Sequence, residues 1–356
     1  MFLEDHWYVA GFPDEFDRKL VARTYLGQAV VLFRALDGAV VAFEDRCAHR
    51  RLPLSLGRLD DDTIECGYHG LVYDRTGACI KVPGQDRIPR GARVRSYPVV
   101  DRHGYVWIWM GEAELADEGK IPDFSRLTDP DLGRHRIALH VLGNYQLIVD
   151  NLLDLSHLPY VHSTTTGNPP VSEDAKVANE RHGDTVQVKR WAKDVPPSRT
   201  FAEFGEYGGN IDMWSISQFQ PPSYVRVSYG SVPASRGVPH DGPPGDAIWQ
   251  PGHWGFQVFH GLTPETEVTT HQFRYILHEK GAADEATTAE FYRQNDQIIN
   301  EDRVIFEAQQ KALSSDPQGA SADDIKSDAT IVADGGLDLA RAINDSIARK
   351  SRAPVR

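Results

Sequence analysis

Two short segments of this chain each pair a cysteine with a histidine, and these pairs constrain the fold more than any other feature. The first segment reads Cys47-Ala48-His49 and the second reads Cys66-Gly67-Tyr68-His69, with 16 residues between them. Glycines near both segments, Gly57 and Gly70, indicate tight turns. Each pair therefore lies on a loop, and a fold that uses all four side chains must bring the two loops together.

The sequence around these pairs is typical of an antiparallel β domain. Short runs of β-branched and aromatic residues flank Gly-containing turns, which is the usual signal for a β-hairpin. We expect three such hairpins: Ala29–Phe33 with Ala39–Phe43 around Asp37-Gly38, Tyr73–Val82 around Thr76-Gly77, and Tyr97–Trp109 around His103-Gly104.

Three kinds of structure use two cysteines and two histidines in this way. A structural zinc site accepts the four side chains, but its usual spacing is C-x2–4-C with H-x3–5-H. A disulfide between Cys47 and Cys66 would leave both histidines unused. An iron–sulfur cluster with two Cys on one iron and two His on the other needs one mixed pair from each of two loops. The spacing favours the cluster, with zinc and four unrelated buried side chains as the alternatives.

The length and net charge of the chain limit its domain organisation and the classes of function that it can have. The 356 residues exceed what one ordinary core supports, so we expect two subdomains. A net charge of −13 argues against broad binding to nucleic acid or to an anionic membrane. The longest apolar stretch, Ala29–Phe43, is interrupted by Arg34 and Asp37, so we expect no membrane span. We see no secretion signal at the start, and three cysteines do not make a disulfide scaffold, so we expect a cytoplasmic protein.

The second part of the chain mixes strands with helices, which gives an α+β fold class. We expect a small all-β domain at 1–112, a linker at 113–135, and a larger domain at 136–356 with an antiparallel sheet flanked by helices. The Pro- and Gly-rich stretch 232–255 is expected as a long surface loop, either over the site or at a subunit edge. The expected strands are Val186–Trp191, Met213–Phe219, Val225–Tyr229 and Val268–Leu277, and the expected helices are Gln146–Leu158, Glu285–Leu313 and Leu337–Arg349.

A second group of candidate ligands lies near the first of these helices. His157 and His162 are five residues apart, which on a straight helix is about 140° of rotation. They share one metal ion only if the helix breaks between them, and Pro159 is a helix breaker at that place. The long helix adds Asp302, on an apolar stripe with Phe291, Ile298, Ile305 and Gln309. A buried carboxylate needs a partner, either a metal or a salt bridge or cap. Two His and one carboxylate are the donor set of non-haem Fe(II) oxygenases.

These segments resemble a known family. CAHRRLPLSLG and CGYHGLVYD resemble the two cluster-binding boxes of Rieske proteins. DNLLDLSHLPYVH, QFQPPSYVRV, TPETEVTTH and NEDRVIFEAQQKAL resemble oxygenase components of the vanillate O-demethylase and dicamba monooxygenase type, over nearly the whole chain. The resemblance implies that Cys47, His49, Cys66 and His69 bind a Rieske 2Fe–2S cluster, and that His157, His162 and Asp302 bind a mononuclear Fe(II).

The resemblance also implies roles for two further residues near the iron. Asp154 matches the residue that bridges the iron site of one subunit to a Rieske histidine of the next, in a head-to-tail homotrimer. Asn151 matches a position close to the iron. Respiratory Rieske proteins carry two further cysteines, whose places are taken here by Leu52 and Tyr68. We interpret Cys79, which lies outside both boxes, as an inert strand cysteine.

The function implied by the resemblance is that of the terminal oxygenase component of a multicomponent Rieske monooxygenase. Such an enzyme uses O₂ and NAD(P)H electrons to oxidise a small aromatic compound, by O- or N-demethylation with release of formaldehyde. Its partner is a separate reductase with a flavin or ferredoxin-type centre, because this chain has no G-x-G-x-x-G that opens a helix after a strand. A ring-hydroxylating dioxygenase or C–H hydroxylase, and a Rieske electron carrier without catalysis, remain as alternatives.

The substrate pocket is predicted less directly. We expect Asn210 and His260 to orient a carboxylate or phenol of the substrate. Aromatic side chains of the second domain are expected to form the wall of the pocket, or else to belong to the core of a sheet. These are Trp191, Trp214, Phe219, Trp249, Trp254, Phe256 and Phe259.

Overall fold

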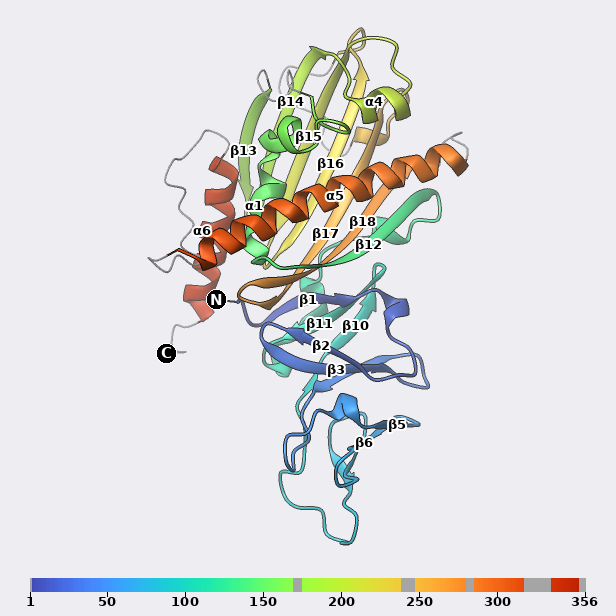
Figure 1. Ribbon diagram of the computed structural model, residues 1–356, viewed down its shortest axis with the longest axis vertical. Coiled ribbons are helices and arrows are strands. Elements are labelled where there is room, and N and C mark those ends of the chain that lie inside the picture. Colours follow the sequence, from blue (N-terminus) through green and yellow to red (C-terminus); the bar gives the residue numbers. More distant parts are fainter. Residues whose placement is uncertain (1, 169–174, 238–246, 280–284, 317–333, 352–356) are drawn as a thin grey trace. The chain divides into compact units, whose positions relative to one another are not determined.

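The computed structural model describes residues 2–168, 175–237, 247–279, 285–316 and 334–351, which fall into two compact units (Figure 1). One unit comprises residues 2–128 with 263–267, and the other comprises 129–262 with 268–356. The expected domain limits remain predictions. The segment expected as a linker, 113–135, contains three 3-10 turns and the start of a long strand: η3 (Ala113–Leu115), η4 (Glu118–Lys120), η5 (Ser125–Thr128) and β12 (Leu132–Val141). Among the described residues, no helix is both long and apolar enough to cross a membrane.

The first unit is built from three antiparallel sheets, with strand orders β1-β11-β10, β2-β3-β4-β9 and β5-β6-β7-β8. All three predicted hairpins are confirmed, and Gly38, Gly77 and Gly104 in their turns have φ of 87°, 77° and 76°, which glycine adopts without strain. The strands are β1 (His6–Gly11), β2 (Val21–Tyr25), β3 (Gln28–Arg34), β4 (Val40–Glu44), β5 (Arg58–Asp60), β6 (Thr63–Glu65), β7 (Val72–Tyr73), β8 (Cys79–Lys81), β9 (Ser96–Tyr97), β10 (Val99–Arg102) and β11 (Tyr105–Met110), with 3-10 turns η1 (Pro13–Glu15) and η2 (Leu54–Leu56).

The thiols of this unit belong to one of its apolar cores. Cys47 and Cys66 pack in one cluster with Phe33 and Phe43, and the pleated strands β3 and β4 supply both aromatic rings. Cys79 is also buried in this cluster, and its Sγ lies 3.3 Å from the carbonyl oxygen of Lys81. The close-packed side chains of this core therefore hold the loops that carry Cys47 and Cys66 in place.

The second unit is organised around a seven-stranded antiparallel sheet of order β12-β18-β17-β16-β15-β14-β13. All four strands expected from the sequence are present in it. The strands not yet given are β13 (Lys176–His182), β14 (Thr185–Val195), β15 (Ile211–Gln220), β16 (Tyr224–Pro233), β17 (Trp254–Thr266) and β18 (Thr269–Glu279).

Three strands of this sheet were not predicted from the sequence. β12 and β13 are rich in charged residues, which mask the alternation of a half-buried strand. β17 follows the Pro- and Gly-rich stretch, and the expected loop overlaps its first two residues as well as the end of β16. The part 238–246 of that loop lies outside the described residues, and Ala247–Trp249 form a 3-10 turn, η7.

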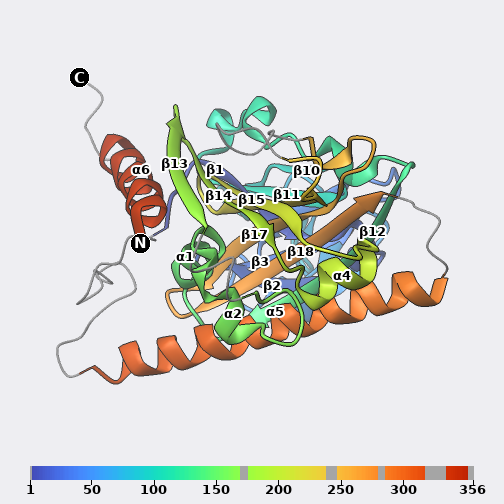
Figure 2. The same cartoon turned by 90° about the horizontal axis from the view of Figure 1, so that it is seen from above.

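Helices α1 (Tyr145–Leu153), α4 (Arg199–Phe204) and α5 (Glu285–Ser314) lie on one side of this sheet, and α6 (Gly335–Ser351) lies beside its β13 edge (Figure 2). α1 lies on β15 and β16, and α5 contacts α1, α4 and β12. α6 lies against β13 and β14. The two long helices predicted from the sequence, α5 and α6, are confirmed to within two residues at each end.

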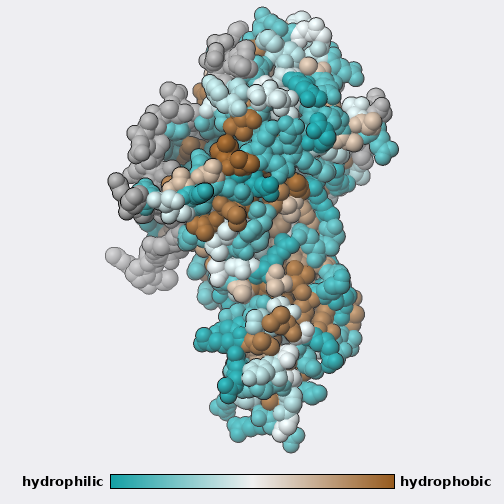
Figure 3. Space-filling model, viewed as in Figure 1, coloured by the Kyte–Doolittle hydropathy of each residue, from teal (hydrophilic) through white to brown (hydrophobic). Residues whose placement is uncertain are grey.

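The buried face of α5 differs in part from the predicted stripe. Phe291 and Asp302 are buried as expected, but Ile305 is 38% exposed and Gln309 is also exposed. The buried positions are Phe291, Gln294, Asn295, Ile299, Asp302, Phe306 and Gln310. Several of these buried residues are polar, and a search for a stripe of apolar residues does not detect them. In the view that has α5 in front, Figure 3 shows a mostly hydrophilic surface with apolar residues scattered over it.

Candidate metal centres and active-site pocket

The two Cys–His segments fold into matching loops. In each loop the cysteine carbonyl accepts a hydrogen bond from the amide four residues later, and the cysteine amide donates to the carbonyl five residues later. These pairs are Cys47 with Arg51 and Leu52, at 3.0 and 2.8 Å, and Cys66 with Gly70 and Leu71, at 3.1 and 2.8 Å. Two loops of the same local geometry thus present equivalent Cys and His positions.

The side chains of these loops form a donor set of the kind that a two-iron cluster uses. Cys47 and Cys66 are each 2% exposed, whereas His49 and His69 are exposed and their ring centroids lie 4.5 Å apart. Burial and the neighbouring Cys47 thiol raise the pKa of Cys66, so a thiolate forms here most readily when a metal replaces the proton. The donor set fits a cluster with one iron bound by buried sulfur and the other by outward-facing imidazole.

Tyr73 is a residue of this centre that the sequence did not reveal. Its hydroxyl oxygen lies 3.2 Å from Cys47 Sγ and accepts a hydrogen bond from the Ala48 amide at 3.1 Å. Burial, and then the neighbouring Cys47, raises the pKa of Tyr73, which keeps the phenol protonated and able to donate to the sulfur. A hydrogen bond to a ligand sulfur is one of the means by which proteins tune cluster potentials.

The second group of ligands depends on a break in the chain after α1. α1 ends at Leu153, and the 3-10 turn η6 (Leu155–His157) and the short helix α2 (Leu158–Val161) follow. The Asp154 carboxylate caps η6, accepting from the Ser156 amide at 2.9 Å and its hydroxyl at 3.0 Å. The prediction that Pro159 breaks the helix was therefore wrong. Pro159 lies in the first turn of α2, where its missing N–H costs nothing.

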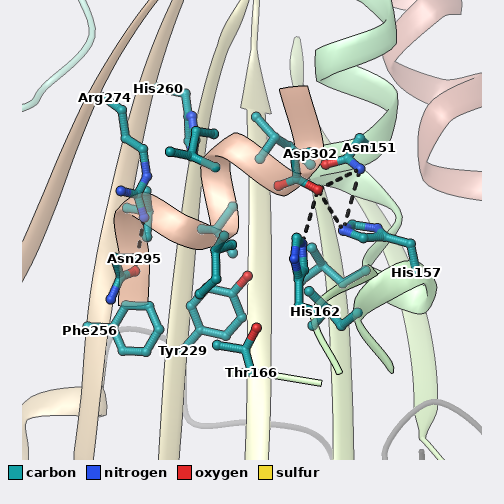
Figure 4. A pocket seen from close by; sticks show the side chains of 17 residues that line it. Asn151, His157, His162, Thr166, Tyr229, Phe256, His260, Arg274, Asn295 and Asp302 are labelled. Carbon is teal, nitrogen blue, oxygen red and sulfur yellow. Dashed lines mark hydrogen bonds and ion pairs between the residues drawn. The ribbon is translucent and has the colours of Figure 1, made fainter. Parts of the chain in front are cut away.

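Both histidines are oriented through the ring nitrogen that faces away from the site. Nδ1 of His157 donates to the carbonyl oxygen of Asp154 at 2.7 Å, and Nδ1 of His162 donates to Oε2 of Glu301 at 2.7 Å. In each neutral ring this leaves Nε2 without a proton and free to bind a metal. The two Nε2 atoms face Asp302 (Figure 4).

Asp302 completes the candidate metal site. Its Oδ1 lies 3.0 Å from Nε2 of His162 and 3.6 Å from Nε2 of His157, and the three ligand atoms lie within 4.8 Å of one another. Nε2 of His162 is buried and makes no hydrogen bond, as expected of an atom whose partner is a metal. Two imidazoles and one carboxylate fit Fe(II) with open positions for other ligands.

The electrostatics of the two histidines differ. Burial is the largest effect on His157 and lowers its pKa. Burial also opposes protonation of His162, but the carboxylates of Asp302 and Glu301 outweigh it and raise its pKa. A divalent ion at the triad therefore competes with a proton more strongly at His162 than at His157.

Asn151 borders the triad without belonging to it, and Arg190 contacts Asp154 next to it. Nδ2 of Asn151 lies 3.4 Å from both Nε2 of His157 and Oδ1 of Asp302, while its Oδ1 is buried without a hydrogen bond. Arg190, on β14, is 7% exposed, and its NH2 lies 3.6 Å from Oδ1 of Asp154. The predicted residues Asn151 and Asp154 thus lie beside the triad, and Arg190 is an addition from the structure.

Glu301 is a further residue that the sequence analysis did not identify. It directly precedes Asp302 on α5, and its two carboxylate oxygens have different partners. Oε2 accepts from His162, and Oε1 accepts from Nε2 of Gln297 at 2.7 Å. The sequence signal for Glu301 is its place next to Asp302. Consecutive residues of a helix point about 100° apart, so two adjacent acids can face one site from different sides.

A pocket opens beside the triad, lined by α1, the η6–α2 segment, strands β16 to β18 and α5 (Figure 4). Its middle is apolar, with Leu155, Leu158, Val227, Phe256, Val258 and Ile299. Its polar wall includes Thr166, Tyr229, His260, Arg274 and Asn295. This is the form of a small-molecule site, with an apolar body and a few placed polar groups.

Only some of the residues that were predicted to line the substrate pocket do so. His260 lines the pocket, but Asn210 is exposed, outside the pocket lining, and its Nδ2 donates to the carbonyl and carboxylate oxygens of Asp194, each at 3.0 Å. Of the seven predicted aromatic residues, Phe256 alone is among the described lining residues. The others are packing residues; Trp191, Trp214 and Trp249, for example, form a separate apolar cluster with Ile216, Val232 and Ile248.

Comparisons with known proteins agree with this geometry. Residues 6–98 match the Rieske [2Fe-2S] domain, and residues 141–350 match the vanillate O-demethylase oxygenase C-terminal domain. The chain is 39% identical over 349 residues to a putative toluene-4-sulfonate monooxygenase iron-sulfur subunit of Comamonas testosteroni, covering 98% of this chain and 97% of that one. It is 33% identical to a vanillate O-demethylase oxygenase subunit of a Pseudomonas species, over 89% of each chain. Its structure superposes on dicamba monooxygenase bound to 3,6-dichlorosalicylic acid with a TM-score of 0.86 and 29% identity, over 99% of each chain.

Replacing Glu301 by Gln should weaken iron binding at the triad. The variant removes the charge that orients His162 and raises its basicity, and loss of such an outer partner costs about 10- to 100-fold in metal affinity. We expect Fe(II) titration of the metal-free protein to show this loss, with the visible absorption of the cluster unchanged. The matched control is Glu285→Gln, an exposed position in the first turn of the same helix. Equal affinity of both variants and the parent would contradict the role of Glu301.

Proposed function

This chain belongs to the family of Rieske oxygenase components that includes vanillate O-demethylase and dicamba monooxygenase, and on that premise we propose that it demethylates a small aromatic compound. The observation that carries the proposal is the presence of two different iron-binding donor sets in one chain. One is the Cys2His2 pair of loops, and the other is the His2Asp triad beside an apolar pocket. A Rieske electron carrier needs only the first set.

The residues divide into cofactor ligands and groups that arrange the pocket. Cys47, His49, Cys66 and His69 would hold the 2Fe–2S cluster, and His157, His162 and Asp302 would hold Fe(II). When bound, the cluster supplies single electrons and the iron supplies O₂ activation. The apolar wall excludes water from the reacting carbon, and His260 offers a hydrogen bond to a polar group of the substrate.

Asp154 is proposed to connect the two kinds of centre between subunits. Its carboxylate is 18% exposed, and it lies beside both His157 and Arg190. In the proposed homotrimer, this carboxylate accepts a hydrogen bond from a Rieske imidazole of the neighbouring subunit. The outward-facing rings of His49 and His69 support the proposal, because an exposed imidazole edge is available to a neighbour.

The partner is proposed to be an NAD(P)H-dependent reductase with a flavin or ferredoxin-type centre. Two relatives are named as an oxygenase subunit and an oxygenase component, and such names imply a separate electron-donating component. We place the chain in the cytoplasm, where the thiols needed for the cluster stay reduced.

The alternative within the same family is a ring-hydroxylating dioxygenase or C–H hydroxylase. It uses the same iron ligands, so the triad does not decide between the reactions. Relatives named as O-demethylases and as an N-alkylformylase favour removal of an alkyl carbon. A hydroxylated methoxy or N-methyl carbon is unstable and leaves as formaldehyde.

Product analysis tests the proposed reaction directly. With NADH, a compatible reductase and methoxylated aromatic acids, we expect formaldehyde in an amount equal to the O₂ consumed. A ring-hydroxylated product without formaldehyde would contradict demethylation and support the dioxygenase or hydroxylase. Absence of any substrate-dependent O₂ uptake, in protein that binds iron at the triad, would contradict the oxygenase function itself.

Replacing Asp154 by Asn should stop turnover without loss of either metal. Asn still accepts the hydrogen bond from the Ser156 amide, so the cap of η6 is kept, but the negative charge that receives the neighbouring imidazole is lost. We expect parental iron content and cluster absorption with near-background product formation. The control is Asp131→Asn at an exposed position. Parental turnover by the Asp154 variant would remove this residue from the link between subunits.

A further inference from the structure

Basic residues gather in the part of the chain that carries the cluster ligands. Residues 46–95, which include all four of those ligands, contain ten Lys or Arg and six Asp or Glu, whereas the whole chain has 38 of the former and 51 of the latter. A surface hollow of about 540 Å³ lies in this unit, and three exposed arginines line it. They are Arg46, Arg51 and Arg95, and we call the hollow that they line the arginine hollow.

The acidic side chains of the arginine hollow already have partners. Both carboxylate oxygens of Glu44 face Arg46, one at 2.8 Å from Nε and the other at 3.1 Å from Nη2. The buried carboxylate of Asp45 accepts hydrogen bonds from the amide and the hydroxyl of Ser55, at 2.7 and 2.6 Å. Among the described residues, neither carboxylate forms an ion pair with Arg51 or Arg95.

The other two arginines of the hollow keep uncompensated charges. Arg95 donates to neutral oxygens, from Nη2 to the Gly111 carbonyl at 2.6 Å and from Nη1 to Oε1 of Gln28 at 3.3 Å, and its guanidinium lies 4.9 Å from the centre of the Tyr97 ring. Arg51 is exposed, and no acidic side chain in the described part of the chain pairs with it. A partner that brings a carboxylate to the hollow therefore meets two positive charges without a counter-charge.

The backbone of Arg51 indicates that its side chain serves a purpose outside its loop. Arg51 and Gly70 hold equivalent places in the two matching loops, because the amide of each donates to the carbonyl oxygen of the cysteine four residues earlier. Both lie in the left-handed region, with φ of 59° and 70°. Glycine adopts this conformation without strain, whereas a residue with a Cβ does not. Strain of this kind is typical of positions that are kept for function.

The arginine hollow adjoins the first cluster-binding loop. Arg46 directly precedes Cys47, and the Arg51 amide donates to the Cys47 carbonyl oxygen at 3.0 Å. A partner that is seated in the hollow is therefore next to this loop. At an ionic strength of about 0.1 M, exposed charges more than about 10 Å apart are largely screened. An acidic partner at the hollow then responds to these arginines rather than to the net charge of −13.

We propose that the arginine hollow is the docking surface for the electron donor, and that it receives a carboxylate from an acidic ferredoxin-type domain of the reductase. This inference deepens the proposed function by naming the surface for its reductase, and it rests on that function for the identity of the donor. The reduced donor passes one electron to the oxidised cluster, so the donor is oxidised, the cluster is reduced and no covalent bond changes. Transient electron-transfer complexes have small interfaces, in which complementary charge sets the association rate and the orientation.

Binding of an acidic plant-type 2Fe–2S ferredoxin tests the inference independently of turnover. Calorimetric titration of the metal-loaded protein at an ionic strength of about 0.1 M should show binding, and at about 1 M, where the screening length is about 3 Å, this binding should be about 10-fold weaker or more. We expect Arg51→Gln to raise the Kd at the lower salt about 2- to 5-fold, the range for one exposed ion pair, and Arg51→Glu to raise it further. No binding at the lower salt, or equal affinity of the parent and both variants, would overturn the inference.

A matched control removes the same charge at the opposite end of the β2–β3 hairpin. Tyr25 pairs with Gln28 at the end that borders the hollow, and Lys19 lies beyond Val21 at the other end, with its side chain 82% exposed. Lys19→Gln should bind the ferredoxin with the parental Kd. An equal loss of affinity in this control would mean a non-specific effect of net charge and would overturn the inference.

The rate of cluster reduction gives a second readout. Stopped-flow reduction by the reduced ferredoxin should slow in both Arg51 variants, and Arg95→Gln, which leaves the first loop unchanged, should slow it as well. Reduction by photoreduced deazariboflavin, which is small and uncharged, should keep its parental rate and show that the cluster is intact. Equal slowing with both reductants would mean a damaged cluster site and would overturn docking at the hollow.

A second copy of this chain is the other acidic candidate for the arginine hollow. Light scattering of the Arg51→Glu variant should give the parental oligomeric mass, and a changed mass would assign the hollow to contacts between copies and overturn the inference. Failure of the proposed function looks different. The ferredoxin would bind and reduce the cluster with the expected dependence on Arg51, but no formaldehyde would form.

Discussion

The candidate iron site depends on the turn at Asp154. α1 ends at Leu153, before either histidine, and the short segments η6 and α2 then carry His157 and His162. The chain leaves the helix at Asp154, whose carboxylate caps the next turn and whose carbonyl oxygen accepts the Nδ1 proton of His157. A cap of this kind contributes about 1 kcal/mol, so one residue both ends the helix and orients a ligand. Arg190 faces the same carboxylate from β14.

Helix α5 supplies the remaining parts of the site from one rigid element. Asp302 faces the metal position, while Glu301 faces the far side of the His162 ring. Two turns earlier, Asn295 holds Arg274 at the other end of the pocket. Because these residues share one helix, their spacing is set by helix geometry rather than by flexible loops. A buried, preset arrangement of ligands and outer partners is what a reactive metal centre requires.

The candidate metal ligands could be proposed from the sequence, but the residues around them could not. Cys47, His49, Cys66 and His69, and likewise His157 and His162, stand at spacings that few chemistries use, whereas the choice of Asp302 rested on the family resemblance. The position of the helix break was not, since proline both ends helices and begins them, and local propensity does not separate the two. Glu301 and Arg274 resemble exposed charges until the tertiary contacts are known. Asn210 has suitable chemistry for a pocket, but it lies elsewhere and holds Asp194.

Two unlike iron centres are proposed for every chain, and metal analysis tests this most directly. Protein reconstituted under anaerobic conditions should contain two irons from the cluster and one from the triad, or three in all, together with the visible absorption of a Rieske centre. The variant Asp302→Ala should keep the absorption and lose only the single iron. A parent protein that holds two irons and never a third, or that is colourless, would contradict the account.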